Sequence, residues 1–414
     1  MSYVPQTREQ YSAHIPALHL LCNLGWTFLS TEACLQLRGG TREVLMKPRL
    51  VEALQARRFE YKGEWYPLSP SAIDQIVREI SALNLGEGLL SANERLYNKL
   101  ALGVTVTEFM PDGKKHQPTI AVIDWNDPDP AANRWDVTEE LEVLSTHGTH
   151  SRVPDVVCYV NGIPLAVIEA KRPDSGHTAK AMVDEGVSQH LRNQRPDEIP
   201  QLFAYAQLLV AANHTDGRYG TTHTAAKFWA RWREEEFSDA LLTKWKNQPL
   251  APDTRTALLA GKPARLKAYF GQLWSQPLLP TDQDRLLAAL LQPARLLEFL
   301  RFFVLFDRKV GKVVARYQQF FGIRALIARI GERRPDGGRQ GGIVWHTTGS
   351  GKSFTMVFLT KALVQHDSLK ACRVVVVTDR LDLEDQLARN FMSSGAFGSA
   401  LATRKEGEKA KVGS

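Results

Sequence analysis

Residues 154–171 read Pro154-Asp-Val-Val-Cys-Tyr-Val-Asn-Gly-Ile-Pro-Leu-Ala-Val-Ile-Glu-Ala-Lys171. Two apolar runs flank the dipeptide Asn161-Gly162. This dipeptide is the strongest short signal for a tight hairpin, because both residues tolerate a positive φ. The segments 156–160 and 163–170 are therefore predicted to pair as antiparallel strands.

The predicted hairpin gathers three ionisable side chains. Asp155 comes directly before the first strand, and Glu169 and Lys171 lie at the end of the second. Side chains alternate between the faces of a strand, so Glu169 and Lys171 point the same way. Folding the hairpin brings Asp155 towards Glu169. The sequence therefore predicts one small site that holds two carboxylates and a lysine.

This combination suits hydrolysis of a phosphodiester. Mg²⁺ prefers hard oxygen ligands, so Asp155, Glu169 and the carbonyl of Ala170 are the predicted metal ligands. Lys171 is predicted to orient the attacking water or to help deprotonate it. The alternative is a surface hairpin with ordinary charged residues. The hairpin geometry, the apolar strand before Glu169 and the preceding Pro154 favour the site.

A second motif, Ile343-Val-Trp-His-Thr-Thr-Gly-Ser-Gly-Lys-Ser353, predicts a phosphate-binding loop. Glycines let backbone N–H groups approach phosphates, the lysine reaches the β- and γ-phosphates, and the final hydroxyl binds Mg²⁺. His346 departs from the strict pattern, which has glycine there. The predicted nucleotide-binding residues are Thr348, Gly349, Ser350, Gly351, Lys352 and Ser353.

The surroundings of this loop predict a βαβ unit and a parallel sheet: a strand over 343–345, a helix over 352–365 and a strand over 373–378. Elsewhere, the segment 9–28 is expected to form a helix that leads into a turn at Gly25-Trp26 and a short strand. Further helices are expected over 71–83, 89–102 and 179–192, and strands over 104–109, 119–123 and 208–212. The segment 39–66 is a candidate local insertion.

Composition limits the class of protein. The chain has 414 residues, 43% of them apolar, and a formal net charge of +7. These values indicate a globular protein of two or three domains and favour an anionic partner, although a generic basic protein has the same charge. No signal peptide and no apolar stretch of membrane-spanning length are evident, so a cytoplasmic location without a membrane is expected. Reduced thiols are expected at Cys22, Cys34, Cys158 and Cys372.

The motif around Asp155, Glu169 and Lys171 resembles the PD-(D/E)xK nuclease core of the RecB-like branch, an α/β fold. The longer stretch IPLAVIEAKRP resembles the restriction (R) subunit of type I restriction-modification enzymes, in its N-terminal portion. Gln201-Leu-Phe-Ala-Tyr205 resembles the later Q-x-x-x-Y motif of these nucleases. The resemblance implies that Gln201 and Tyr205 line the DNA or orient the catalytic site. The alternative is one face of a helix.

WHTTGSGKS also resembles the motor of these subunits, a RecA-like helicase lobe of superfamily 2. Arg316-Tyr-Gln-Gln-Phe320 resembles its adenine-reading Q motif, in a register that favours Gln319 over Gln318. Residues 374–387 resemble helicase motif Ia. The resemblance implies the cofactors Mg²⁺ and ATP, double-stranded DNA as substrate, and methyltransferase (M) and specificity (S) subunits as partners.

The resemblance gives the expected domains: a nuclease domain over 1–235, a mostly helical connector over 236–310, a partial first motor lobe over 311–402 and a polar, disordered tail over 403–414. A Walker B strand and a second lobe are missing, so the chain is interpreted as a fragment without ATP hydrolysis of its own. The alternatives are a RecB-like nuclease-helicase of DNA repair and a catalytically silent assembly module.

Overall fold

A computed structural model describes residues 7–174, 181–307, 310–347 and 351–366, together with residues 369, 374, 375 and 377. The chain forms two compact units, one up to Leu297 and one from Glu298 onward. The predicted tail over 403–414 and most of the motif over 374–387 lie outside the described residues.

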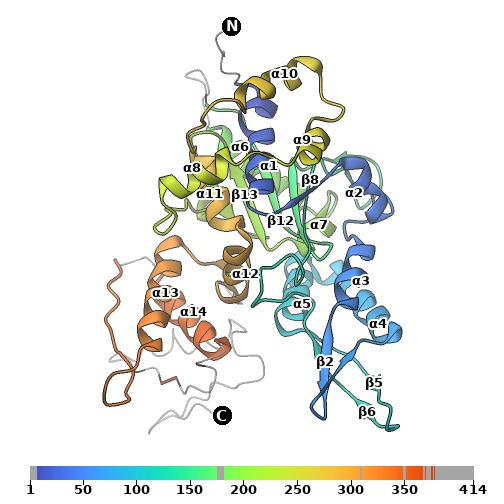
Figure 1. Cartoon of the computed structure of the whole chain (residues 1–414), viewed down its shortest axis with the longest axis vertical. Coiled ribbons are helices and arrows are strands. Elements are labelled where there is room, and N and C mark those ends of the chain that lie inside the picture. Colours follow the sequence, from blue (N-terminus) through green and yellow to red (C-terminus); the bar gives the residue numbers. More distant parts are fainter. Residues whose placement is uncertain are drawn as a thin grey trace. The chain divides into compact units, whose positions relative to one another are not determined.

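The first unit is built on a six-stranded mixed sheet (Figure 1). Its neighbours β1 and β8 are parallel, as are β12 and β13, and the other neighbouring pairs are antiparallel. The chain is therefore a mixed α/β protein, as predicted. In spatial order the strands are β1 (Thr27–Leu29), β8 (Trp135–Glu139), β11 (Val156–Val160), β12 (Ile163–Ala170), β13 (Leu208–Ala212) and β14 (Gly217–Gly220).

The central hairpin β11–β12 has the predicted bounds and turn. Asn161 and Gly162 both have positive φ, 52° and 78°. The Asn161 side chain is buried, where it accepts from the Arg134 N–H at 2.7 Å and donates to the Val122 carbonyl at 2.9 Å. A Cβ atom on Gly162 would lie 2.4 Å from the Met46 carbonyl oxygen. The turn is therefore fixed by backbone conformation and by close packing.

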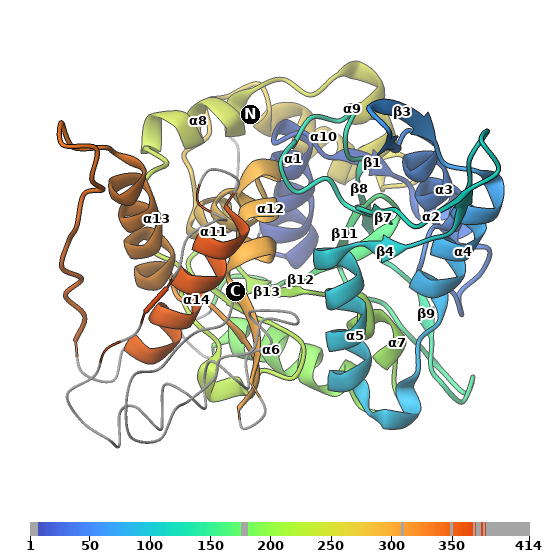
Figure 2. The same cartoon turned by 90° about the horizontal axis from the view of Figure 1, so that it is seen from below.

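Helices cover this sheet, and Figure 2 shows α5 and α7 side by side. α1, α2 and α9 contact the β1–β8 end, while α6 and α7 contact β12. The described helices of the first unit are η1 (Gln10–His14), α1 (Ile15–Asn23), α2 (Thr31–Arg38), α3 (Lys47–Gln55), α4 (Pro70–Ser81), η2 (Leu85–Glu87), α5 (Leu89–Leu102), α6 (Met182–Asn193), α7 (Pro200–Tyr205), η3 (Ala226–Phe228), α8 (Asp239–Asn247), α9 (Pro252–Leu259), α10 (Ala264–Leu273) and α11 (Asp282–Leu291); α12 (Pro293–Phe302) crosses the boundary at Leu297.

In the described part of the first unit, four short strand pairs lie outside the main sheet: β2 (Arg58–Tyr61) with β3 (Glu64–Pro67), β4 (Val104–Thr105) with β7 (Thr119–Ile120), β5 (Glu108–Phe109) with β6 (Lys115–His116), and β9 (Val143–Leu144) with β10 (Ser151–Arg152). The single strand predicted over 104–109 is wrong. Its two ends pair with different partners, so the chain must leave strand geometry between them. The segment 39–66 contains α3 and the β2–β3 hairpin.

The helices α8 to α11 belong to the same compact unit as the sheet. This unit continues past the predicted domain boundary at residue 235 and ends at Leu297. Trp26 Nε1 donates to the Leu291 carbonyl at 2.8 Å, and Gln283 Nε2 donates to the Ala13 carbonyl at 2.8 Å. These buried bonds join α11 to the N-terminal helices. The division into domains at 235 and 310 stays a prediction.

The second unit contains a hairpin, β15 (Val304–Asp307) with β16 (Gly311–Val314), followed by α13 (Tyr317–Gly331) and α14 (Lys352–Gln365). The helix predicted over 352–365 is confirmed. The mostly helical connector predicted over 236–310 is not helical at its end, because residues 304–307 form the strand β15.

The strand predicted over 343–345 is wrong: Ile343 and Trp345 are 93% and 91% exposed. A parallel strand is stable only beside another strand, and none pairs with this segment among the described residues. Residues 373–378 lie mostly outside the described ones, so the rest of the βαβ unit stays a prediction.

Among the described residues, no helix is long and apolar enough to span a membrane.

The described cysteines are free thiols: Cys34 and Cys158 are buried and Cys22 is partly buried. Burial raises the pKa of Cys22 to about 12, so this thiol is unreactive at neutral pH. Cys372 lies outside the described residues.

Gly162→Ala is expected to destabilise the chain by at least about 2 kcal/mol more than Gly63→Ala, because overpacking against backbone adds to the cost of a positive φ. Gly63 is the matched control: it has a φ of 85° in the β2–β3 turn, and a Cβ there would meet no atom within 4 Å. Urea unfolding followed by circular dichroism measures both. Equal losses would contradict the role of the Met46 contact.

Candidate active site

The three residues predicted to form one site lie together at the end of β12. Lys171 Nζ is 3.0 Å from Asp155 Oδ2 and 3.3 Å from Glu169 Oε2. The Ala170 N–H donates to Asp155 Oδ2 at 2.8 Å. The register explains this, since Val156 pairs with Ile168 and so places Asp155 beside Glu169. The predicted juxtaposition is confirmed, and the catalytic and metal-binding roles of these residues stay predictions.

A fourth charged residue, which the sequence analysis missed, completes the cluster. Glu9 Oε1 lies 3.7 Å from Lys171 Nζ, and its carboxylate accepts a backbone hydrogen bond from Arg172. Glu9 immediately precedes η1, far from β12 in the sequence. An acidic residue before a first helix carries no chemical signal of its own, so only the packing of η1 against the sheet reveals its place.

Burial sets the electrostatics of the cluster formed by Asp155, Glu169, Lys171 and Glu9, here called the carboxylate–lysine cluster. It raises the pKa of Glu169 well above its ordinary value, and the nearby Asp155 carboxylate raises it further. Burial alone would lower the pKa of Lys171, but attraction by Glu169, Asp155 and Glu9 outweighs it and raises that pKa. Lys171 therefore keeps its proton at neutral pH. Three carboxyl groups face one ammonium, so ionisation of all three would leave an excess of negative charge.

The donor set fits a divalent cation. Carboxylate oxygens of Asp155, Glu169 and Glu9 and the carbonyl of Ala170 are the hard ligands that Mg²⁺ prefers. A cation there would also relieve the repulsion that raises the pKa of Glu169. α6 packs tightly over the same place because it carries glycine: a Cβ on Gly186 would lie 3.3 Å from Glu169 Cβ.

Gln201 and Tyr205, predicted to serve the same site, direct their hydrogen bonds elsewhere. Gln201 Nε2 donates to the Leu144 carbonyl at 2.8 Å, and the buried Tyr205 hydroxyl donates to the Ile80 carbonyl at 3.0 Å. These bonds fasten α7 to β9 and α4. The predicted roles of the pair, lining the DNA or orienting the catalytic site, stay predictions.

The phosphate-loop residues Thr348, Gly349 and Ser350 lie outside the described residues. Gly351 has a φ of 83° and caps α14, which begins at Lys352. The exposed Lys352 and the partly buried Ser353 thus lie at a helix N-terminus, where backbone N–H groups favour anions.

The structure distinguishes the two glutamines of the predicted adenine-reading motif. Gln319 is buried, and its Nε2 donates to the Gly351 carbonyl at 3.1 Å, whereas Gln318 is exposed. The geometry therefore agrees with the register that favours Gln319, and adenine recognition itself stays a prediction.

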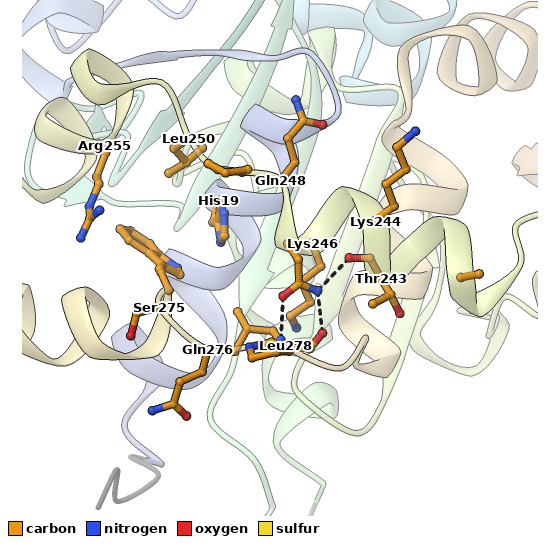
Figure 3. Close-up of a pocket in the computed structure, with 15 residues that line it drawn as sticks. His19, Thr243, Lys244, Lys246, Gln248, Leu250, Arg255, Ser275, Gln276 and Leu278 are labelled. Atoms are coloured by element: carbon orange, nitrogen blue, oxygen red, sulfur yellow. Dashed lines mark hydrogen bonds between the residues drawn. The ribbon is translucent and has the colours of Figure 1, made fainter. Parts of the chain in front are cut away.

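A separate cavity of about 650 Å³ is lined by residues of α8, by Arg255 of α9, by residues 274–278 after α10 and by His19 of α1 (Figure 3). Its described lining includes Lys244, Lys246 and Arg255 and no acidic residue, so it suits an anion better than a cation. Lys246 is hydrogen-bonded to Asp284. The cavity contains no member of the carboxylate–lysine cluster.

Comparison with known proteins identifies the family. Residues 6–228 match the family model described as type I restriction enzyme R protein N terminus, and residues 318–411 match the SWI2/SNF2 ATPase model. The type I restriction enzyme HindI endonuclease subunit of Haemophilus influenzae is 32% identical over 79% of this chain and 27% of its own length. The MjaIXP endonuclease subunit of Methanocaldococcus jannaschii is 27% identical over 93% of this chain and 34% of its own length.

The chain therefore belongs to the type I restriction enzyme R protein family, to whose N-terminal region it corresponds. It spans about a third of the length of these two relatives. The resemblance stated from the sequence is confirmed.

The raised pKa of Glu169 predicts a pH-dependent stability. The folded chain binds this proton more tightly than the unfolded chain, so the stabilisation is present below about pH 4.5 and is lost as pH rises through the folded-state pKa. Without divalent cations, Glu169→Gln should therefore be more stable than the wild type, by a margin that grows from pH 4.5 to pH 8.

Thermal unfolding in EDTA at several pH values measures this margin. Glu60→Gln, which alters an exposed carboxylate on β2, is the control and should show no such trend. A margin for Glu169→Gln that is constant or shrinks with rising pH would contradict the assigned electrostatics.

Proposed function

We propose that this chain carries the Mg²⁺-dependent endonuclease centre of a type I restriction enzyme R subunit, with a PD-(D/E)xK fold, and that it cleaves DNA phosphodiester bonds. The observation that carries the proposal is the convergence of Asp155, Glu169 and Lys171 at one end of β12. Membership of the R protein family supports it, as do the two relatives, which are named as endonuclease subunits.

Asp155, Glu169 and the Ala170 carbonyl would hold Mg²⁺, and Glu9 is an additional oxygen donor beside them. When bound, the metal supplies a more acidic water and stabilises charge on the phosphate. Lys171 is a protonated cation among carboxylates, so its role in the proposal is to orient the attacking water and to offset the charge that develops on the phosphate. This favours the water-orienting alternative for Lys171 over removal of a proton from water.

The second unit supports a nucleotide-binding role. We propose that Lys352 and Ser353, with Gly351 and the three preceding loop residues, bind the phosphates of ATP, and that Gln319 reads the adenine. In the whole protein this would be the start of an ATP-driven DNA translocase working with methyltransferase and specificity subunits. The SWI2/SNF2 ATPase match over 318–411 supports this part.

Asp155→Asn and Lys171→Ala are each expected to lower Mg²⁺-dependent cleavage of double-stranded DNA by about 10²-fold or more, because each removes a group at the reacting phosphate. Plasmid cleavage is measured with the chain alone and after assembly with its methyltransferase and specificity subunits. Arg192→Ala, on the surface of α6, is a control for altered charge.

Circular dichroism checks that each variant keeps its fold. Equal cleavage by wild type and Asp155→Asn would overturn the nuclease proposal. Absence of cleavage both alone and in the complex would favour the silent assembly module.

Gln319→Ala is expected to weaken ATP binding at least about 10-fold, since a lost hydrogen bond in a specific site costs about 1–3 kcal/mol. Gln318→Ala, one residue away and exposed, should leave the affinity unchanged and is the matched control. Lys352→Ala should weaken binding of both ATP and GTP. Calorimetry measures all three, and unchanged affinity in Lys352→Ala would remove the proposed phosphate loop.

A further inference from the structure

A second group of metal-ligand side chains lies beside the carboxylate–lysine cluster. One ligand atom each from His14, Glu139 and Glu140 lies within 4.8 Å of the others. His14 and Glu139 are buried and Glu140 is partly buried. The Glu140 N–H donates to the Asp155 backbone carbonyl at 2.9 Å, so this second group adjoins the first one.

Local backbone structure brings these residues together. His14 ends η1, a π-helical turn in which the Ile15 N–H bonds to the Gln10 carbonyl. Bonding between residues five apart places Glu9 and His14 on the same side of the helix. Glu139 ends β8, and neighbouring strand residues normally face opposite sides of a sheet. The positive φ of Glu140, 47°, breaks that alternation.

His14 supplies the observation that points to a ligand. Its side chain is 5% exposed, and its Nε2 lies 3.4 Å from Glu139 Oε2 without forming a hydrogen bond. A buried ring nitrogen without a hydrogen bond is costly in a native protein and calls for an explanation. A metal ion between imidazole and carboxylate gives that nitrogen a partner.

Lys262 marks the same place as one that holds a cation. Its Nζ lies 2.9 Å from Glu139 Oε2, the oxygen that faces His14. This lysine follows α9 and reaches the end of β8 from the helical segment. This oxygen cannot bind an ammonium group and a metal ion equally well at the same time, so Lys262 would compete with a metal ion for it.

We propose that His14, Glu139 and Glu140 form a second divalent-cation site, separate from the one at Asp155 and Glu169. One imidazole and two carboxylates suit Mn²⁺ and other first-row transition ions better than Mg²⁺, which prefers an all-oxygen shell. The site extends the proposed nuclease centre, but its occupancy does not depend on cleavage. Its test therefore uses metal binding rather than activity.

Mn²⁺ binding to the whole chain is measured by calorimetry and by pulsed electron paramagnetic resonance, which detects coupling of the Mn²⁺ electrons to a ligating ¹⁴N nucleus. The wild type should bind two Mn²⁺ ions, one with ¹⁴N coupling. Glu169→Gln should weaken Mn²⁺ binding at the Asp155–Glu169 site and leave the ion with ¹⁴N coupling in place. His14→Gln should abolish the coupling and weaken the second site at least about 10-fold, because a ligand is lost.

Three further variants test the site without changing the buried His14, whose substitution could disturb folding. Glu140→Gln alters a partly buried group and should also weaken the coupled ion, whereas Glu142→Gln, an exposed carboxylate two residues along, should not. Lys262→Met should strengthen the coupled ion several-fold, because it frees the shared oxygen of Glu139. A purely structural ion pair between Lys262 and Glu139 predicts no such gain.

The outcomes separate this inference from the proposed function. Absence of ¹⁴N coupling in both the wild type and Lys262→Met overturns the second site and leaves the Asp155–Glu169 site standing. Coupling that persists in His14→Gln also overturns it. If the wild type shows an ion with ¹⁴N coupling but Glu169→Gln binds Mn²⁺ as the wild type does, the result would instead contradict the site at Asp155 and Glu169.

Discussion

The register of the β11–β12 hairpin is the constraint on which the candidate site depends. Asn161 and Gly162 can both adopt positive φ, and the Met46 carbonyl leaves no room for a side chain on Gly162. With the turn fixed there, Asp155 must lie beside Glu169 at the other end of the hairpin. A slip by one residue would turn Glu169 and Lys171 to the opposite face and dissolve the cluster.

The chain places carboxylates where they repel one another, and it compensates with lysines. Lys171 faces Asp155, Glu169 and Glu9, and Lys262 faces Glu139. Burial makes each ionised group costly unless it is paired. The two ammonium groups offset part of this repulsion. Because of such a site, the chain is expected to be less stable than the same fold would be without it.

The helical segment after the sheet contributes to this arrangement and is more than a spacer. Gln283 bonds to the Ala13 carbonyl next to His14, and Lys262 reaches Glu139. Both residues come from the region that sequence reasoning set apart as a connector. Their contacts fit the compact unit that ends at Leu297. The N-terminal turn, the sheet and these helices thus meet around His14 and Glu139.

The sequence by itself determined the hairpin, the gathering of Asp155, Glu169 and Lys171, the helix that starts at Lys352, and the family. These features rest on neighbouring residues: a turn dipeptide, strand alternation and a glycine-rich loop are local, so a short stretch encodes them. Residues 343–345 show the limit of local reasoning, since an apolar run is a strand only when another strand pairs with it. Tertiary structure alone decided the places of Glu9, His14 and Lys262. Their contacts join segments far apart in the chain, and these residues come together only after those segments pack.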